Sequence, residues 1–127
     1  MPEPRRLGTD AEDRAAAHLL NHGYTLLTRR YKAPHGEIDI IALDGDTLVF
    51  VEVKWRRSEK FDPAESVTER KIRRLSAAAR HYLHEAGLGE REVRFDLIAI
   101  QGDVLNHHQN AFEPSSSSPQ EPLDEPE

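Results

Sequence analysis

The sequence contains no cysteine, which excludes a disulfide framework and a thiolate metal site. It has no apolar run near the ~18 residues of a membrane helix, and no apolar segment follows its first six residues as in a secretory signal. No glycine-rich phosphate loop or serine-centred triad is recognisable either. We therefore expect a cytoplasmic protein with no membrane partner.

Acidic residues predominate, with 23 Asp and Glu against 17 Lys and Arg and a formal net charge of −6. Five of these acids, and no basic residue, fall within residues 113–127. Residues 1–112 therefore carry 17 basic and 18 acidic side chains, a net charge of −1 that does not exclude a nucleic-acid partner. We expect a single folded domain over residues 7–112, followed by a disordered acidic tail over residues 113–127.

Two helices are predicted from start and stop signals. Thr9 and Glu12 match a capping box, which places the first helix at about residues 10–22. Ser66 and Glu69 match a second capping box, and apolar residues then recur at helical spacing as far as Gly87.

Strands are predicted over residues 24–31, on both sides of an Asp44-Gly45 turn within residues 36–55, and over residues 94–100. The last strand contains Arg94 and Asp96, which we expect to form a buried ion pair. The predicted order is α-β-β-β-α-β, an α/β fold in which helices flank a mixed sheet.

Four charged residues of the hairpin are predicted to share one face. If Asp44-Gly45 is a two-residue loop, Asp39 lies opposite Phe50 and Glu37 lies opposite Glu52. Asp39 and Glu52 are then diagonal neighbours about 7–8 Å apart, and Lys54 follows on the same face.

Two facing carboxylates destabilise a sheet unless a cation binds them. Mg²⁺ prefers oxygen ligands and usually takes only one or two carboxylates, leaving positions for water and substrate phosphate. With Lys54 orienting the nucleophile or stabilising the developing oxyanion, this combination is typical of phosphodiester hydrolysis.

A simpler interpretation treats the same charges as the solvated face of a hairpin, because sheets alternate in this way routinely. Ile41, Leu48 and Phe50 lie on the same predicted face, so the acids border an apolar surface rather than a wholly polar one. This weakens the simpler interpretation and leaves it open.

The spacing Gly36-Glu-Ile-Asp39, twelve residues, then Glu52-Val-Lys54 resembles the PD-(D/E)xK nuclease motif, although no proline precedes the aspartate. A longer ordered set resembles the YraN family: Gly8-x-x-x-Glu12-x-x-Ala15, Gly36-Glu-Ile-Asp-Ile-Ile-Ala, Val49-Phe-Val-Glu-Val-Lys, Lys71-x-x-x-Leu75-x-x-x-Ala79-x-x-Tyr82-Leu83, Arg94-Phe-Asp96 and Ala111-Phe112. The resemblance covers nearly all of residues 7–112 and implies a restriction-endonuclease-like fold related to Holliday junction resolvases.

The resemblance implies that Asp39 and Glu52 bind Mg²⁺, with Mn²⁺ as a possible substitute, and that Lys54 is catalytic. It adds the Val53 backbone carbonyl as a further ligand, and it makes Glu12 a candidate catalytic acid and metal ligand. The capping box explains Glu12 equally well. Glu37 also matches the motif and is a further candidate ligand.

Basic residues follow the predicted catalytic strand and the start of the second helix, where they could grip phosphates or simply be solvated. The candidates for nucleic-acid binding are Lys71, Arg56, Arg57, Arg70 and Arg74, with Lys71 the strongest because it belongs to the family pattern. His35 immediately precedes the motif and could approach substrate. The remaining histidines show no zinc-ligand spacing.

Three functions remain open. The leading hypothesis is a Mg²⁺-dependent endonuclease for branched or damaged DNA, with a homodimer implied by analogy to resolvases. The alternative is a catalytically silent nucleic-acid-binding module of the same fold that acts through protein partners. A scaffold that binds neither metal nor DNA ranks last, because it leaves the facing acids unexplained.

Overall fold

A computed structural model describes residues 6–56 and 67–115, which form two helices and one five-stranded sheet. In chain order the elements are α1 (Arg6–Asn21), β1 (Thr25–Ala33), β2 (Gly36–Asp44), β3 (Thr47–Arg56), α2 (Glu69–Ala86), β4 (Val93–Gln101) and β5 (Val104–His108).

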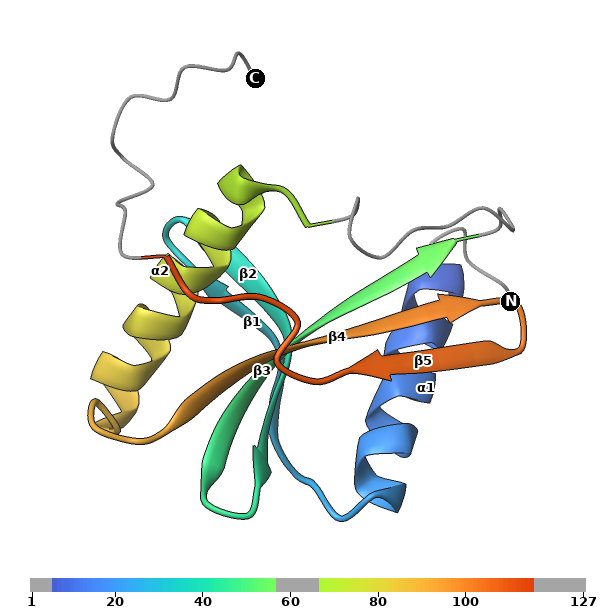
Figure 1. Cartoon of the computed structure of the whole chain (residues 1–127), viewed down its shortest axis with the longest axis horizontal. Coiled ribbons are helices and arrows are strands. Elements are labelled where there is room, and N and C mark those ends of the chain that lie inside the picture. The colour runs from blue at the N-terminus through green and yellow to red at the C-terminus, as the bar shows by residue number, and fades with distance from the viewer. Residues whose placement is uncertain (1–5, 57–66, 116–127) are drawn as a thin grey trace.

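The sheet follows chain order, β1-β2-β3-β4-β5 (Figure 1). β3 and β4 run parallel, joined through α2, whereas the other neighbouring strands run antiparallel. The predicted α/β fold with a mixed sheet flanked by helices is therefore confirmed, and β5 extends the predicted order by one strand.

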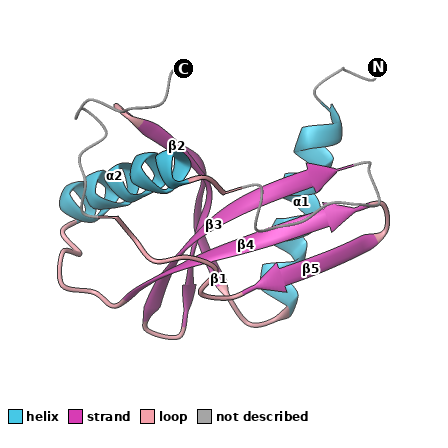
Figure 2. Ribbon diagram, turned by 45° about the horizontal axis from the view of Figure 1, so that its top comes forward, coloured by secondary structure: helices cyan, strands magenta, loops and turns pink. Residues whose placement is uncertain are grey.

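The helices cover opposite faces of the sheet (Figure 2). Alternation along β3 explains why both faces are apolar, because Val49 and Val51 pack with α1 whereas Leu48 and Phe50 pack with α2. Ile41 joins the α2 side, as the predicted shared face requires. The charged end of the hairpin is thus attached to a sheet that is buried on both sides.

The N-terminal helix begins earlier than predicted. α1 starts at Arg6 rather than near residue 10, so Thr9 lies inside the helix and the Thr9–Glu12 capping box is wrong. Ala11, Ala15 and Leu19 form its buried stripe. The Glu12 side chain is only 16 % exposed, so it is turned toward the body of the domain.

Thr68, rather than Ser66, caps α2. The Thr68 hydroxyl accepts a hydrogen bond from the backbone N–H of Lys71 at 3.1 Å. Ser66 lies outside the described residues. The predicted end of the helix is confirmed, because Gly87 takes the left-handed conformation with φ 72° and closes the last turn.

The β2–β3 turn corrects the predicted register. The two loop residues are Gly45 and Asp46, so Asp44 pairs with Thr47 and Ile41 pairs with Phe50. Gly45 has φ 63° at the first central position, as a type II′ turn favours. The pairing shifts by one residue on each strand, which preserves the shared face but replaces the predicted pairing of Asp39 with Phe50 and of Glu37 with Glu52.

β5 was not predicted because its sequence is short, polar and only partly buried. It follows a Gly102-Asp103 turn in which Gly102 has φ 60°, the same Gly-Asp arrangement as in the β2–β3 turn. A Gly-Asp pair between two strands is a known hairpin signal, so the sequence contained the information.

The ion pair predicted in β4 is confirmed and is part of a larger network. The Arg94 guanidinium donates to both carboxylate oxygens of Asp96, at 2.9 and 3.0 Å, and Asp96 is fully buried. His107 of β5 and the backbone N–H of Asn110 complete the Asp96 shell. Burial would raise the pKa of Asp96, but these hydrogen bonds hold it below its usual value.

Most of the acidic tail expected over residues 113–127 lies outside the described residues. Within the described part, Ser115 donates its backbone N–H to the Ser76 hydroxyl at 2.8 Å. Neither helix in residues 6–56 and 67–115 combines the length and hydropathy needed to cross a membrane.

Candidate active site

Asp39 and Glu52 lie one position beyond the last pair of the β2–β3 ladder, which is Ile40 with Val51. Continuing the register makes them direct rather than diagonal neighbours, closer than predicted. Asp39 Oδ2 accepts a hydrogen bond from the backbone N–H of Val53 at 2.8 Å. The Asp39 side chain therefore continues the contact between the strands where the backbone ladder stops.

Burial and mutual repulsion make this carboxylate pair unfavourable without a cation. Glu52 is only 5 % exposed. Burial raises the pKa of Asp39 from 3.8 to about 7, with the negative charge of Glu52 as the next cause. The Val53 hydrogen bond and the charge of Lys71 oppose this shift only in part.

Two lysines lie beside Glu52. Lys71 Nζ forms an ion pair with Glu52 Oε2 at 2.5 Å. Lys54 lies within hydrogen-bonding reach of Lys71, and burial together with the Lys71 charge lowers the pKa of Lys54. Burial alone would lower the pKa of Lys71 as well, but the hydrogen bond and charge of Glu52 raise it.

Gly36 fixes the position of β2 against α2. A Cβ atom at Gly36 would lie 2.5 Å from the carbonyl oxygen of Arg74, far inside van der Waals contact. Only glycine permits this approach. The contact brings the beginning of β2, which supplies Asp39, against the first turns of α2, which supply Lys71.

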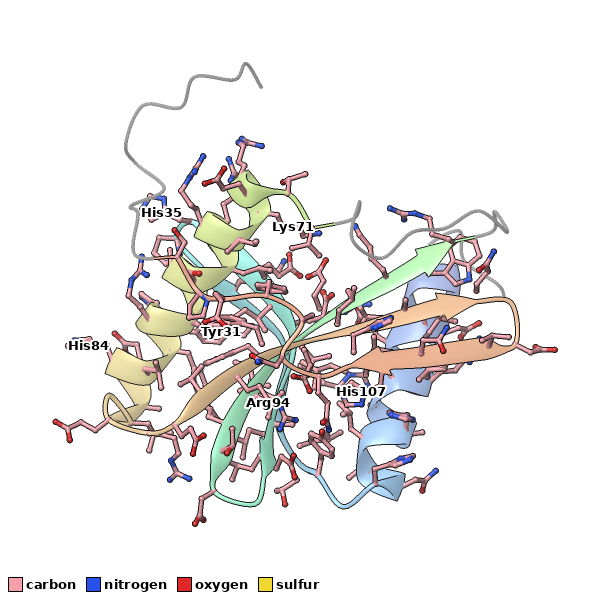
Figure 3. The ribbon with its side chains drawn as sticks, in the orientation of Figure 1. Tyr31, His35, Lys71, His84, Arg94 and His107 are labelled. Atoms are coloured by element: carbon pink, nitrogen blue, oxygen red, sulfur yellow. The ribbon has the colours of Figure 1, made fainter. Side chains whose placement is uncertain are left out.

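An open cleft of about 810 Å³ lies over the carboxylates. Asp39, Glu37 and Glu52 line it together with basic residues from β1, the β1–β2 turn and α2. The basic lining residues are Lys32, His35, Arg70, Lys71 and Arg74. Figure 3 shows Lys71 near the start of α2 and His35 at the same end of the molecule. The chain is acidic overall, yet this cleft combines three acids with four Lys and Arg side chains.

Glu12 lies near the carboxylates but is held by another partner. Glu12 Oε1 accepts a hydrogen bond from Arg30 Nε at 2.8 Å. Its charge contributes to the raised pKa of Asp39, so α1 does bring it close to the site. Glu12 does not line the cleft itself.

The remaining candidates are divided between the site and its surroundings. Lys54 and Arg56 lie on β3 outside the cleft lining, and Arg56 donates to the Trp55 carbonyl at 3.1 Å. Arg57 lies outside the described residues. Lys71, Arg70 and Arg74 line the cleft as a nucleic-acid-binding role requires.

The donor set fits a hard divalent cation. Asp39 and Glu52 supply carboxylate oxygens, and the N–H and C=O of a strand residue point to the same side, so the Val53 carbonyl is also directed toward β2. No three His, Cys, Asp or Glu side chains within the described residues converge as a ready metal cage. Mg²⁺ is the ion that needs the fewest protein ligands, because it keeps several waters.

Two features of the site were not predicted from the sequence. Arg30, with φ 55°, is held in the left-handed region while it binds Glu12; no local sequence signal marks it. Lys71 was predicted to bind phosphate, whereas in the structure it neutralises Glu52. Lys71 and Glu52 are far apart in sequence, so only the docking of α2 reveals the pair.

The sequence matches the profile of the "Uncharacterised protein family UPF0102" over residues 11–100. The chain belongs to this family. A UPF0102 protein of Persephonella marina is 39 % identical over 107 residues, covering 84 % of this chain and 92 % of that protein. One from Chlorobium phaeobacteroides is 46 % identical over 122 residues, covering 87 % and 96 %. The resemblance to YraN, another name of UPF0102, is thereby confirmed.

A solved structure, described as "Crystal structure of SSO0001", aligns with this chain at a TM-score of 0.46 and 20 % identity. The alignment covers 87 % of this chain, which spans about half of that protein, 52 %. We therefore base the functional proposal on UPF0102 membership and on the geometry of this chain, not on the solved structure.

Proposed function

We propose that this UPF0102 protein is a Mg²⁺-dependent endonuclease that hydrolyses phosphodiester bonds of structured DNA, meaning branched or damaged DNA. The observation that carries the proposal is the pair formed by half-buried Asp39 and buried Glu52, which lines one cleft together with Lys and Arg side chains. The acids suit a metal ion, and the basic side chains suit the phosphate backbone.

Asp39, Glu52 and the Val53 carbonyl are the proposed ligands of Mg²⁺, for which Mn²⁺ could substitute. Glu12 and Glu37 are further candidates, and Glu12 would first have to leave Arg30. When bound, the metal would activate a water molecule and neutralise charge on the scissile phosphate.

Lys54 is the proposed catalytic lysine. Burial and the charge of Lys71 lower its pKa, so it gives up a proton more readily than an ordinary lysine does. Its ammonium would orient the attacking water and stabilise negative charge on the phosphate oxygens. Arg70 and Arg74 would hold the strand on either side of the scissile bond, with Arg56 and Arg57 as additional phosphate contacts.

We further propose that the protein acts in the cytoplasm as a homodimer. A DNA substrate and the absence of cysteine fit the cytoplasm. Cutting both strands of a junction requires two active sites, which a homodimer would supply.

The test is cleavage of a labelled four-way junction by purified protein in Mg²⁺, with linear duplex, single-stranded DNA and RNA of the same sequence as comparison substrates. We expect the junction to be cut fastest. Lys54→Met should reduce the rate at least about a hundredfold, as loss of a charge-stabilising group does. Arg80→Met is the matched control, because Arg80 lies on α2 outside the cleft lining and donates to the Ser115 carbonyl.

The silent nucleic-acid-binding module is the second candidate, and the Lys71–Glu52 ion pair favours it. That pair neutralises one of the two acids without metal. Junction binding with no cutting in Mg²⁺ or Mn²⁺ would support this module and contradict the endonuclease.

A further inference from the structure

Lys71 binds one of the two carboxylate oxygens of Glu52, a proposed metal ligand. Its Nζ lies 2.5 Å from Glu52 Oε2, and the Glu52 side chain is 7 % exposed. Lys54 is close to the same amine, so two positive groups already surround this carboxylate. A divalent cation added there would be repelled by Lys71 at short range.

The backbone of Lys71 is fixed, but its side chain can take a second position in the cleft. Thr68 holds the Lys71 backbone N–H in the first turn of α2. The Lys71 side chain is 34 % exposed and lines the cleft. Rotation about its four-carbon stem would move the ammonium from the carboxylate to the cleft space without moving the helix.

We propose that Lys71 is a built-in counter-ion of the carboxylate pair, which a divalent cation displaces, so that metal binding releases the Lys71 ammonium to hold a substrate phosphate. The inference rests on the proposed function, because it concerns the regulation of the same carboxylates. Before metal enters, Lys71 offsets the cost of a buried acid. After metal enters, the same charge is available to nucleic acid.

This exchange couples the two binding events. A metal ion that frees Lys71 increases affinity for phosphate, and a phosphate that retains Lys71 in the cleft increases affinity for the metal by the same factor. The cleft would therefore be fully cationic only when the cation needed for the reaction is present.

The test measures Mn²⁺ affinity from the EPR signal of free Mn²⁺ at pH 8.5, where protons compete little for Asp39. We expect Lys71→Met to bind Mn²⁺ about tenfold more tightly than wild type, because the competing ammonium is gone. Arg80→Met removes a positive charge from the same helix outside the cleft lining and should bind Mn²⁺ as wild type does. Equal or weaker binding by Lys71→Met would overturn the inference.

A measurement on wild type avoids dependence on the folding of the variant. In ¹⁵N-lysine NMR without divalent cations, the Lys71 ammonium should show slow proton exchange because Glu52 holds it. Mg²⁺ should remove that protection, and persistence of the protected signal at saturating Mg²⁺ would refute the displacement.

The outcomes separate this inference from the proposed function. Mn²⁺ binding to wild type that Lys71→Met does not tighten refutes the counter-ion role and leaves the endonuclease standing. The expected tightening without any DNA cleavage supports the counter-ion role and contradicts the endonuclease. If neither protein binds Mn²⁺, both fail.

Discussion

In the folded protein, ionisation of the Asp39 carboxyl group is unfavourable. Its pKa is raised from 3.8 to about 7, chiefly by burial, so the folded protein binds the Asp39 proton more tightly than the unfolded chain does. Protonated Asp39 makes its full contribution to the free energy of unfolding below about pH 4. This contribution is lost as the pH rises to about 7.

Asp39→Asn should therefore stabilise the protein in metal-free buffer at pH 8. We expect a free energy of unfolding about 4 kcal/mol higher than that of wild type, and nearly no difference at pH 4. Urea denaturation with EDTA at the two pH values measures this. Asp103→Asn, an exposed turn residue, is the control and should change little at either pH. A difference for Asp39→Asn that does not depend on pH would contradict the shifted pKa.

Single residues were predictable where strand alternation decides their direction. Glu52 and Lys54 share a face with Phe50 because alternate residues of a strand must, whatever the register. Arg30 and the contact between Lys71 and Glu52 depend on packing between elements distant in sequence. No local pattern encodes such contacts.

At the scale of elements, the contact between β2 and α2 at Gly36 assembles the site. Gly36→Ala places a methyl group against the Arg74 carbonyl oxygen, a rigid backbone atom. We expect this substitution to lower the free energy of unfolding by about 1–3 kcal/mol, as overpacking does. Chemical denaturation measures the change.

Gly89→Ala is the matched control, because a Cβ atom there meets nothing within 4 Å. It should leave stability nearly unchanged. If Gly36→Ala is as harmless as Gly89→Ala, the close approach of β2 to α2 is not a determinant of the fold.

Element type was predictable, but element limits depended on turn chemistry. The hairpin was predicted correctly, but its loop was placed at Asp44-Gly45. The loop is Gly45-Asp46, so the observed pairing differs by one residue on each strand. Both possible turns satisfy the apolar alternation, so only the backbone conformation of Gly45 decides between them. β5 was missed because hydrophobic pattern says little about a polar edge strand.

At the scale of the whole molecule, charge is segregated rather than uniform. The net charge is −6, yet four Lys and Arg side chains and His35 line one cleft beside three acids. DNA affinity should therefore fall steeply with salt concentration, in spite of the acidic composition.

Arg74→Met should weaken binding of junction and duplex to a similar extent and reduce the salt slope by about 1, the expectation for one lost phosphate contact. Fluorescence anisotropy at several KCl concentrations measures the slope. Arg80→Met, on the same helix but outside the cleft lining, should keep the wild-type slope. Equal slopes for all three proteins would exclude the cleft as the DNA-binding surface.

If metal-dependent hydrolysis occurs at the Asp39–Glu52 pair, cleavage must depend on both the metal and Asp39. The most direct measurement is the rate of four-way junction cleavage at pH 8 as a function of Mg²⁺ concentration, for wild type and Asp39→Asn prepared in parallel. We expect cleavage by wild type that saturates with Mg²⁺ and is abolished by EDTA, and a loss of at least about a hundredfold in folded Asp39→Asn. Cleavage by Asp39→Asn at the wild-type rate, or by wild type in EDTA, would contradict hydrolysis at this pair.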